Sequence, residues 1–146
     1  MATTFTLAQG ARSSAVLALG TLASATYVTS SAIDLGATIP LDVTFEVELN
    51  ANGTPSGNKQ LILFAKFSLD NTNFGSGPES GTTATEELDL HVVGVVPCND
   101  TNDHRKFFSL AGLPVARYMK LVAKNDLGVA LTSGNVYRAD ITAVGT

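Results

Sequence analysis

Tryptophan is absent from this 146-residue sequence, and cysteine occurs once, as Cys98. A single cysteine excludes an internal disulfide, so packing alone has to hold the fold, which fits assembly in a reducing compartment. No apolar run approaches the roughly 20 residues that a membrane-spanning helix needs, and the opening residues lack the basic start and apolar stretch of a secretory signal. We therefore expect no membrane partner.

Charge is also scarce. Asp, Glu, Lys and Arg make up 15% of the residues, against about 25% in a typical globular chain. Neutral polar residues replace them, with 17 Thr and 11 Ser. Thr suits pleated strands, Ser suits turns, and a weakly charged surface is desolvated at low cost. The composition favours a β protein suited to protein contacts, although a plain β domain with a Thr-rich face has the same composition.

The net charge of −4 bears on the class of partner. Binding to phosphates needs clustered Lys and Arg in excess. We therefore expect no nucleic-acid partner.

Alternation with a period of two is the main structural signal. Residues 40–49 alternate between apolar and polar side chains, which predicts a half-buried strand. The apolar face of that strand comprises Leu41, Val43, Phe45, Val47 and Leu49. Residues 61–69 are apolar on both faces up to Lys66, which predicts a central strand covered on two sides. Further strands are expected at residues 88–96, 105–110, 116–124 and 135–144, with a short hairpin arm at 129–131.

Turn-forming residues separate these strands. Gly, Asn, Ser and Pro gather in residues 50–58. Residues 70–85 form a loop of a length that is either functional or mobile. No window shows the 3.6-residue period of a helix. The pattern predicts an all-β, antiparallel β-sandwich over residues 27–146, and the long connections favour jelly-roll wiring over a meander.

Residues 1–26 carry a single charge, Arg12, and allow two interpretations. They are either the first strands of the sandwich or an extended arm that orders on a neighbouring subunit. The arm would bury Phe5, Leu7, Val16, Leu17 and Leu19 at the interface.

The sequence shows little that is typical of an enzyme or a cofactor site. His104 lies near Cys98, Asp100 and Asp103, but zinc sites use paired ligands at short spacing, and here the cysteine stands alone. No nucleophile motif and no phosphate-binding glycine loop is present. We therefore expect no catalytic residues, metal or cofactor.

Charge is unevenly distributed along the chain. Residues 104–124 contain bases and no acid, namely Arg105, Lys106, Arg117, Lys120 and Lys124. Residues 79–89 contain acids and no base. Opposite patches would orient docking onto another subunit, with Arg105, Lys106, Lys120 and Lys124 at the interface. The alternative is a solvated face with weak cross-strand pairs inside the chain.

Several segments resemble small virion proteins of tailed bacteriophages, which are jelly rolls or β-sandwiches that decorate or cement capsids or sit in tails. The resemblance is carried by a short Thr- and Ala-rich opening and by residues 69–74 (LDNTNF), 116–125 (ARYMKLVAKN) and 136–141 (VYRADI). It is a likeness of strand style and transfers no site residue. Similar Arg-Tyr-hydrophobic strands also occur in carbohydrate-binding sandwiches.

The resemblance implies a protein of the virion, assembled in the host cytoplasm, that bridges major capsid proteins as a dimer or trimer. A tail-tube, collar or fibre-base component is the nearest competitor in that class. A carbohydrate-binding module is the competitor from another class. It is weakened by the absence of Trp and by the placement of Tyr27, Tyr118 and Tyr137 in expected strands.

Overall fold

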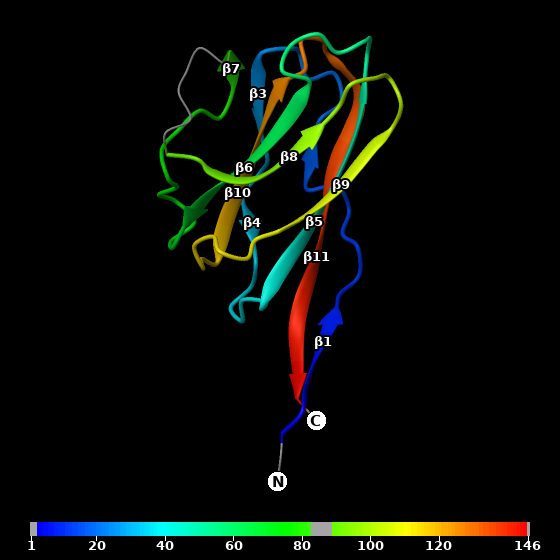
Figure 1. Cartoon of the computed structure of the whole chain (residues 1–146). Helices are drawn as coiled ribbons and strands as arrows, with labels where there is room; N and C mark the ends of the chain where they lie inside the picture. Colours follow the sequence, from blue (N-terminus) through cyan, green and yellow to red (C-terminus); the bar gives the residue numbers. More distant parts are fainter. Residues whose placement is uncertain (1–2, 83–88, 146) are drawn as a thin grey trace.

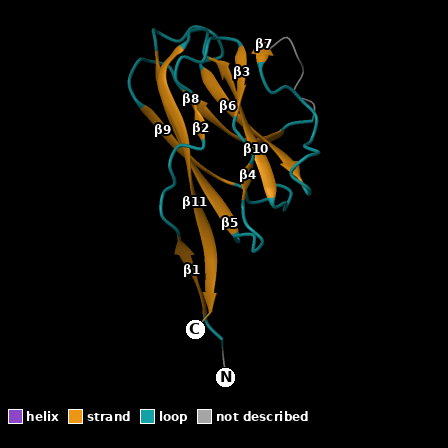
Figure 2. Ribbon diagram, turned by 180° about the vertical axis from the view of Figure 1, so that it is seen from behind, coloured by secondary structure: helices purple, strands orange, loops and turns teal. Residues whose placement is uncertain are grey.

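The computed structural model describes residues 3–82 and 89–145, and its regular structure consists of strands (Figures 1 and 2). That part of the chain has no helix that is long and apolar enough to cross a membrane. Its strands are β1 (Phe5–Gln9), β2 (Leu17–Ala18), β3 (Thr26–Thr29), β4 (Ile33–Asp34), β5 (Asp42–Ala51), β6 (Gln60–Ser68), β7 (Gly81–Thr82), β8 (His91–Pro97), β9 (His104–Ser109), β10 (Tyr118–Asp126) and β11 (Leu131–Gly145).

The strands form two antiparallel sheets that face each other. The first sheet has the order β1-β11-β5-β9, and β2 also pairs with β11. The second sheet has the order β7-β3-β10-β6-β8, and β4 also pairs with β10. The molecule is therefore an all-β sandwich, as the sequence predicts.

The pairings are nested along the chain. The first segment, β1 with β2, pairs with β11, and the second, β3 with β4, pairs with β10. Inside these, β5 pairs with β9 and β6 pairs with β8. A chain paired in this order is one long hairpin wrapped around a core, which is the wiring of a jelly roll. The expected jelly-roll wiring is confirmed.

Alternate residues of β5 and β10 build the interior. Val43, Phe45 and Val47 are fully buried on β5, and they face Met119 and Leu121 of β10 across the sandwich. Leu41 does not share this face, and the prediction that it does is wrong. It lies before the strand, because pairing of β5 with β11 begins at Asp42, and its side chain is 65% exposed.

The prediction of a two-sided central strand at residues 61–69 is confirmed for β6. It lies between β10 and β8, and its outer face buries Phe64 and Lys66 as well. The strand ends at Ser68, however, and Leu69 beyond it is 84% exposed.

The expected division of residues 129–144 into two strands is wrong. Residues 131–145 form one strand, β11, with a register shift between Leu131 and Ser133. Gly134 lies within this strand. Any larger residue there would be crowded, because a Cβ would come within 2.8 Å of the Glu48 carbonyl oxygen and 3.1 Å of the Leu19 Cβ. That glycine marks a close approach of chains and not a turn.

Two further predictions need adjustment. The loop at 70–85 includes β7, which pairs with β3, and residues 83–85 lie outside the described residues. The strand expected at 88–96 begins at His91 and ends at Pro97, and Leu88 is likewise not described. β8 is an edge strand, which is where a proline is tolerated.

The N-terminal segment forms the edge of the first sheet, as in the first-strands interpretation. Its backbone follows β11 in steps, with bonds from the amides of Gly10, Val16 and Leu19 to the carbonyls of Asp140, Val136 and Gly134 respectively. The spacing of these bonds is irregular, so only β1 and β2 qualify as strands.

Candidate interaction surfaces

A two-stranded ribbon projects from one end of the sandwich (Figures 1 and 2). We define this terminal ribbon as β1 together with residues 141–145 of β11. The two strands pair from Phe5 opposite Gly145 to Gln9 opposite Ile141. Pairing of β11 with β5 ends at Ile141, so the rest of the ribbon has no third strand. Isolated two-stranded ribbons are marginally stable in water, and a partner would stabilise this one.

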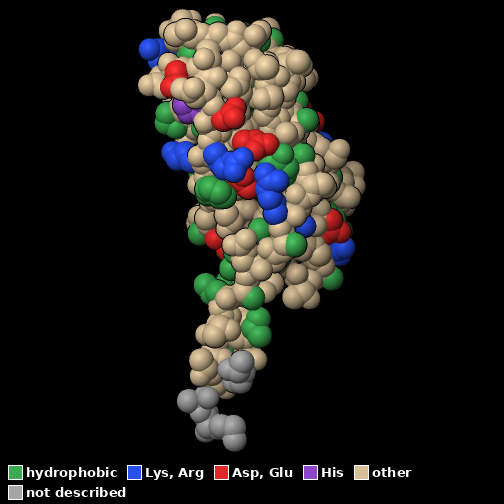
Figure 3. Space-filling view, turned by 90° about the vertical axis from the view of Figure 1, so that its right-hand side faces the viewer, with side chains coloured by type: hydrophobic (Ala, Val, Ile, Leu, Met, Phe, Trp, Pro, Cys, Tyr) green, Lys and Arg blue, Asp and Glu red, His purple; other side chains and the backbone are tan. Residues whose placement is uncertain are grey.

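The terminal ribbon is apolar and uncharged. Phe5 is 69% exposed, Leu7 68% and Val144 44%. Residues 3–10 and 141–145 contain no Asp, Glu, Lys or Arg. Figure 3 accordingly shows apolar and neutral side chains, and no charged ones, on this face of the projection. The predicted interface residues Phe5 and Leu7 are thus accessible to a partner.

Leu17 and Leu19 are not accessible, and their assignment to an interface is wrong. They are 4% and 0% exposed and belong to the chain's own core. Val16 is half-buried and packs against the same core. The physical reason is that the segment follows β11 inward, so its leucines fall between the two sheets.

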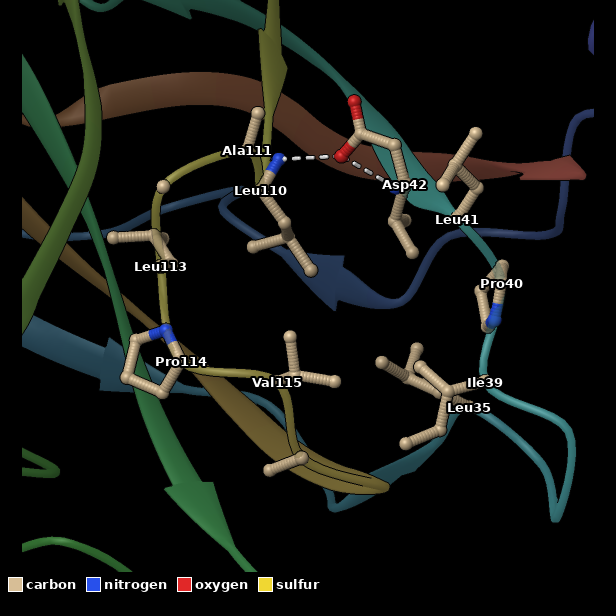
Figure 4. Close-up of a pocket in the computed structure, with 13 residues that line it drawn as sticks. Leu35, Ile39, Pro40, Leu41, Asp42, Leu110, Ala111, Leu113, Pro114 and Val115 are labelled. Carbon is tan, nitrogen blue, oxygen red and sulfur yellow. Dashed lines mark hydrogen bonds between the residues drawn. The ribbon is translucent and has the colours of Figure 1, made fainter.

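A second apolar surface lies where β5 begins and the connection between β9 and β10 passes (Figure 4). We call it the apolar hollow. It encloses about 140 Å³ and is lined mainly by Leu35, Ile39, Pro40, Leu41, Leu110, Leu113, Pro114 and Val115. Val115 is 81% exposed, and it also borders a neighbouring hollow that includes Leu69. The sequence gives no sign of this surface, because its residues come from loops without periodicity.

Asp42 fixes the rim of the apolar hollow. Its Oδ1 accepts bonds from the amides of Val43 at 2.8 Å and Leu110 at 3.1 Å, and its Oδ2 accepts one from the Ser109 hydroxyl. Figure 4 shows the two amide bonds as dashed lines. The carboxylate thereby ties the start of β5 to the end of β9.

The outer face of the first sheet carries a connected set of charges. Arg12 Nε lies 2.8 Å from Glu46, and Arg105 lies 3.1 Å from Glu46 and 3.0 Å from Glu48. The Tyr137 hydroxyl donates to Glu48 at 2.7 Å and, together with Asn135 and Arg105, lowers the pKa of that carboxyl. Figure 3 shows Lys or Arg side chains next to Asp or Glu side chains on this side of the molecule. Arg105 therefore has acidic partners within its own chain.

The second sheet holds the loop at 70–82 by a buried lysine. Lys66 is 4% exposed, and its Nζ donates to the Gly77 carbonyl at 3.1 Å and to Glu79 at 3.0 Å. Lys120 approaches the same carboxylate at 3.3 Å. The bond from Lys66 is the main cause of a lowered pKa of Glu79.

These pairs change the interpretation of the uneven charge along the sequence. Lys120, from the basic run, pairs with Glu79, from the acidic run, inside one molecule. Lys106 donates to the Val95 carbonyl at 2.9 Å, and Lys124 lies 5.9 Å from the Tyr27 ring centroid. Glu86 and Glu87 of the acidic run lie outside the described residues. For the residues that are placed, the geometry favours cross-strand pairs within the chain over opposite docking patches.

Two of the residues weighed for chemistry, His104 and Cys98, contact different oxygen atoms of Asp100. His104 Nε2 lies 2.9 Å from Asp100, while the Cys98 thiol is buried and directed at the Asp100 carbonyl oxygen. Burial raises the pKa of the Cys98 thiol. Across residues 3–82 and 89–145, no three His, Cys, Asp or Glu side chains gather as metal ligands.

The tyrosines are poorly placed for stacking on a sugar. Tyr27 is 3% exposed, and the guanidinium of Arg12 lies 3.3 Å from the centroid of the Tyr137 ring. Tyr118 is half-buried, with Arg117 at 5.0 Å from its ring centroid. The more accessible aromatic rings are Phe5 and Phe107, at 69% and 59% exposed.

No family model and no curated protein matches this sequence. Among solved structures, the chain is similar to one titled as the top component of cowpea mosaic virus, naturally occurring empty particles. The match covers 85% of this chain at 8% identity, with a TM-score of 0.29. This chain spans 59% of the length of that chain. A likeness at this level carries no argument about function.

Proposed function

We propose that this chain is a non-catalytic structural protein of a virion, and that its specific role is to decorate and cement a capsid across junctions between major capsid proteins. The observation that carries the proposal is the terminal ribbon, an exposed and uncharged two-stranded projection that is below the size at which a sheet is stable by itself. The free energy falls when a protein partner covers an exposed apolar surface of this kind.

Two further features support a contact role. The apolar hollow adds exposed Leu41 and Val115 at the surface. Charged groups such as Arg12, Arg105 and Lys120 have partners within the chain, so docking would not have to strip water from isolated charges. The strand style of residues 116–125 and 136–141, which resembles phage virion proteins, points in the same direction.

Cementing would depend on the repetition of weak contacts over the whole shell. A contact limited to the terminal ribbon would bind weakly, because interfaces well below about 800 Å² per partner are typical of transient contacts. Many copies fixed on a closed shell add their contacts, and linked sites bind far more tightly than single ones. Weak individual contacts would therefore be sufficient to hold a shell together.

Co-sedimentation with empty capsid shells tests the proposal. Binding that saturates at a fixed number of copies per shell, and that raises the temperature at which shells burst, would support a cementing role. Binding to purified tails with none to shells would instead support a tail-tube, collar or fibre-base component. Absence of binding to either would overturn the virion proposal.

A carbohydrate-binding module is the second candidate, and Phe107 at 59% exposure is the feature that keeps it open. A glycan array addresses it directly. Reproducible sugar binding that Phe107→Ala abolishes, with Phe5→Ala as the matched control, would favour this candidate over the structural one.

A further inference from the structure

The free edge of β1 has a defined set of unpaired backbone groups. The Gly10 amide donates to the Asp140 carbonyl at 2.8 Å, which makes this a hydrogen-bonded pair and continues the register of β1 with β11. Such pairs alternate along an antiparallel ladder. Thr6 and Ala8 therefore direct their amides and carbonyls toward β11, whereas Phe5, Leu7 and Gln9 direct theirs outward.

The strand β1 lacks the features that prevent an edge strand from pairing with a further strand. Natural sheets protect their edges with charges, prolines or bulges. The strand β1 has the sequence FTLAQ, with neither a charge nor a proline, and its pairing with β11 shows no bulge. The strand is open to the addition of another strand.

The absence of charge in β1 makes a second copy of this chain a suitable occupant. When a strand pairs antiparallel with its own copy, the residue at the two-fold axis faces itself, so a charge there would meet an equal charge. The whole molecule has a net charge of −4, so two copies repel each other at long range. The uncharged segments 3–10 and 141–145 are where this repulsion is weakest.

We propose that two copies of the chain associate through their β1 edges, antiparallel, with Leu7 at the two-fold axis. Leu7 then forms a hydrogen-bonded pair with the same residue of the second copy, and Phe5 pairs with Gln9 in both directions. The two ribbons become a four-stranded sheet in the order β11-β1-β1-β11. This inference concerns how copies meet, and it does not depend on which assembly they join.

The side chains agree with this register. Phe5, Leu7 and Gln9 share one face of β1, and the Phe5 ring already packs over Gly145, 3.3 Å from where a Cβ would lie. Pairing across the axis places the two Leu7 side chains next to each other on that face. A sheet of three or more strands with an apolar face meets the requirement for stability that a lone ribbon does not.

The projection of the ribbon leaves room for this arrangement. The ribbon extends beyond the end of the sandwich (Figures 1 and 2). Antiparallel pairing would point the two ribbons in opposite directions, so the two sandwiches would lie at opposite ends of the new sheet. The contact is confined to five residues of each chain, which predicts a weak dimer that depends on protein concentration.

Sedimentation velocity over a range of concentrations tests the proposal. The expected result is a monomer–dimer equilibrium that Leu7→Lys shifts toward monomer by at least tenfold in dissociation constant. Thr6→Lys is the matched control, because it adds the same charge one residue away, where it faces Ala8 of the other copy. The control is expected to shift the equilibrium much less.

A mixing experiment identifies the register. Leu7→Lys and Leu7→Glu are each expected to be monomeric, and their mixture is expected to dimerise because opposite charges then meet at the axis. A wild-type chain that stays monomeric at every concentration would overturn the proposal. So would a dimer that Leu7→Lys leaves intact, or one that Thr6→Lys disrupts equally. Failure here leaves binding to capsid shells as a separate question, measured by co-sedimentation.

Discussion

The ring of Phe108 lies against the backbone of Gly94, in the volume that any side chain at that position would occupy. Gly94 belongs to β8 and Phe108 to β9, which are edge strands of the two sheets. The contact closes the side of the sandwich where β8 and β9 face each other.

Gly94→Ala is expected to lower the free energy of unfolding by about 1–3 kcal/mol, because the added methyl group displaces the Phe108 ring. Urea denaturation measures the change. Gly75→Ala is the control, since nothing lies within 4 Å of a Cβ at that position, and it should leave the midpoint nearly unchanged. Equal effects of the two substitutions would contradict the contact.

Leu19→Ala is expected to cost about 2–5 kcal/mol, because the side chain is fully buried between the sheets. Leu7→Ala removes the same atoms from an exposed side chain and should cost less than about 0.5 kcal/mol in the monomer. Thermal unfolding at low protein concentration compares them. A small effect of Leu19→Ala would indicate that residues 17–19 belong to a detachable arm after all.

The pair of Lys66 and Glu79 predicts an asymmetry between two substitutions. Glu79→Ala leaves the buried ammonium with the Gly77 carbonyl and should cost about 1–3 kcal/mol. Lys66→Met removes the buried charge itself and should cost less. In the Lys66→Met background, Glu79→Ala is expected to have little further effect, which a double-mutant cycle in urea would measure. A larger loss from Lys66→Met than from Glu79→Ala would contradict this account.

Asp34 is expected to contribute to stability in a pH-dependent way. Arg117 binds both of its oxygens, at 2.8 and 2.9 Å, and together with the Gly36 amide it lowers the pKa of Asp34 to about 2. A carboxyl with a lowered pKa in the folded state stabilises above its unfolded pKa and loses that effect as pH falls. The stability difference between wild type and Asp34→Asn should therefore be present at pH 7 and shrink between pH 3.8 and about 2. Urea midpoints at pH 7 and pH 2.5 measure it, and an equal difference at both pH values would rule the mechanism out.

Val115→Asp tests the apolar hollow as a contact surface. The side chain is 81% exposed, so the substitution should leave the unfolding temperature nearly unchanged. If the hollow contacts a capsid, co-sedimentation with shells should fall severalfold, because a charge would be buried at the interface. Thr132→Asp makes the same charge change at an exposed position outside the hollow. A loss of binding in both variants would indicate a general effect of charge.

The strands that alternate strictly could be predicted from the sequence. Val43, Phe45 and Val47 occupy one face because every second residue of β5 meets the same core. The same alternation puts Met119 and Leu121 of β10 on one face, and both are fully buried. Leu41 fits the alternation equally well, but the pattern does not reveal where pairing with β11 stops.

The prediction of a strand break before residue 135 is wrong because tertiary packing, and not a turn, accounts for Gly134. Residues 132–134 (TSG) are typical of a turn, yet β11 passes through them, because Gly134 lets the chain approach Glu48 and Leu19. Similarly, the burial of Leu17 and Leu19 depends on a distant strand and leaves no periodic signal in a short, irregular edge. The exposed candidates Leu69 and Val115 lie in loops, where exposure depends on neighbours that a single sequence does not specify.

The position of β11 has a consequence for biosynthesis. This strand pairs with β1, β2 and β5, yet residues 131–145 leave the ribosome after every segment with which they pair. The earlier strands β5 and β9 are adjacent only to each other in the first sheet until then. The strands β1 and β2 therefore lack their pairing partner until residues 131–145 have been synthesised. Pairing between segments so distant in the sequence is slow. A chain that stalls or is released before β11 is complete would expose apolar core residues, and we expect chaperones to bind it.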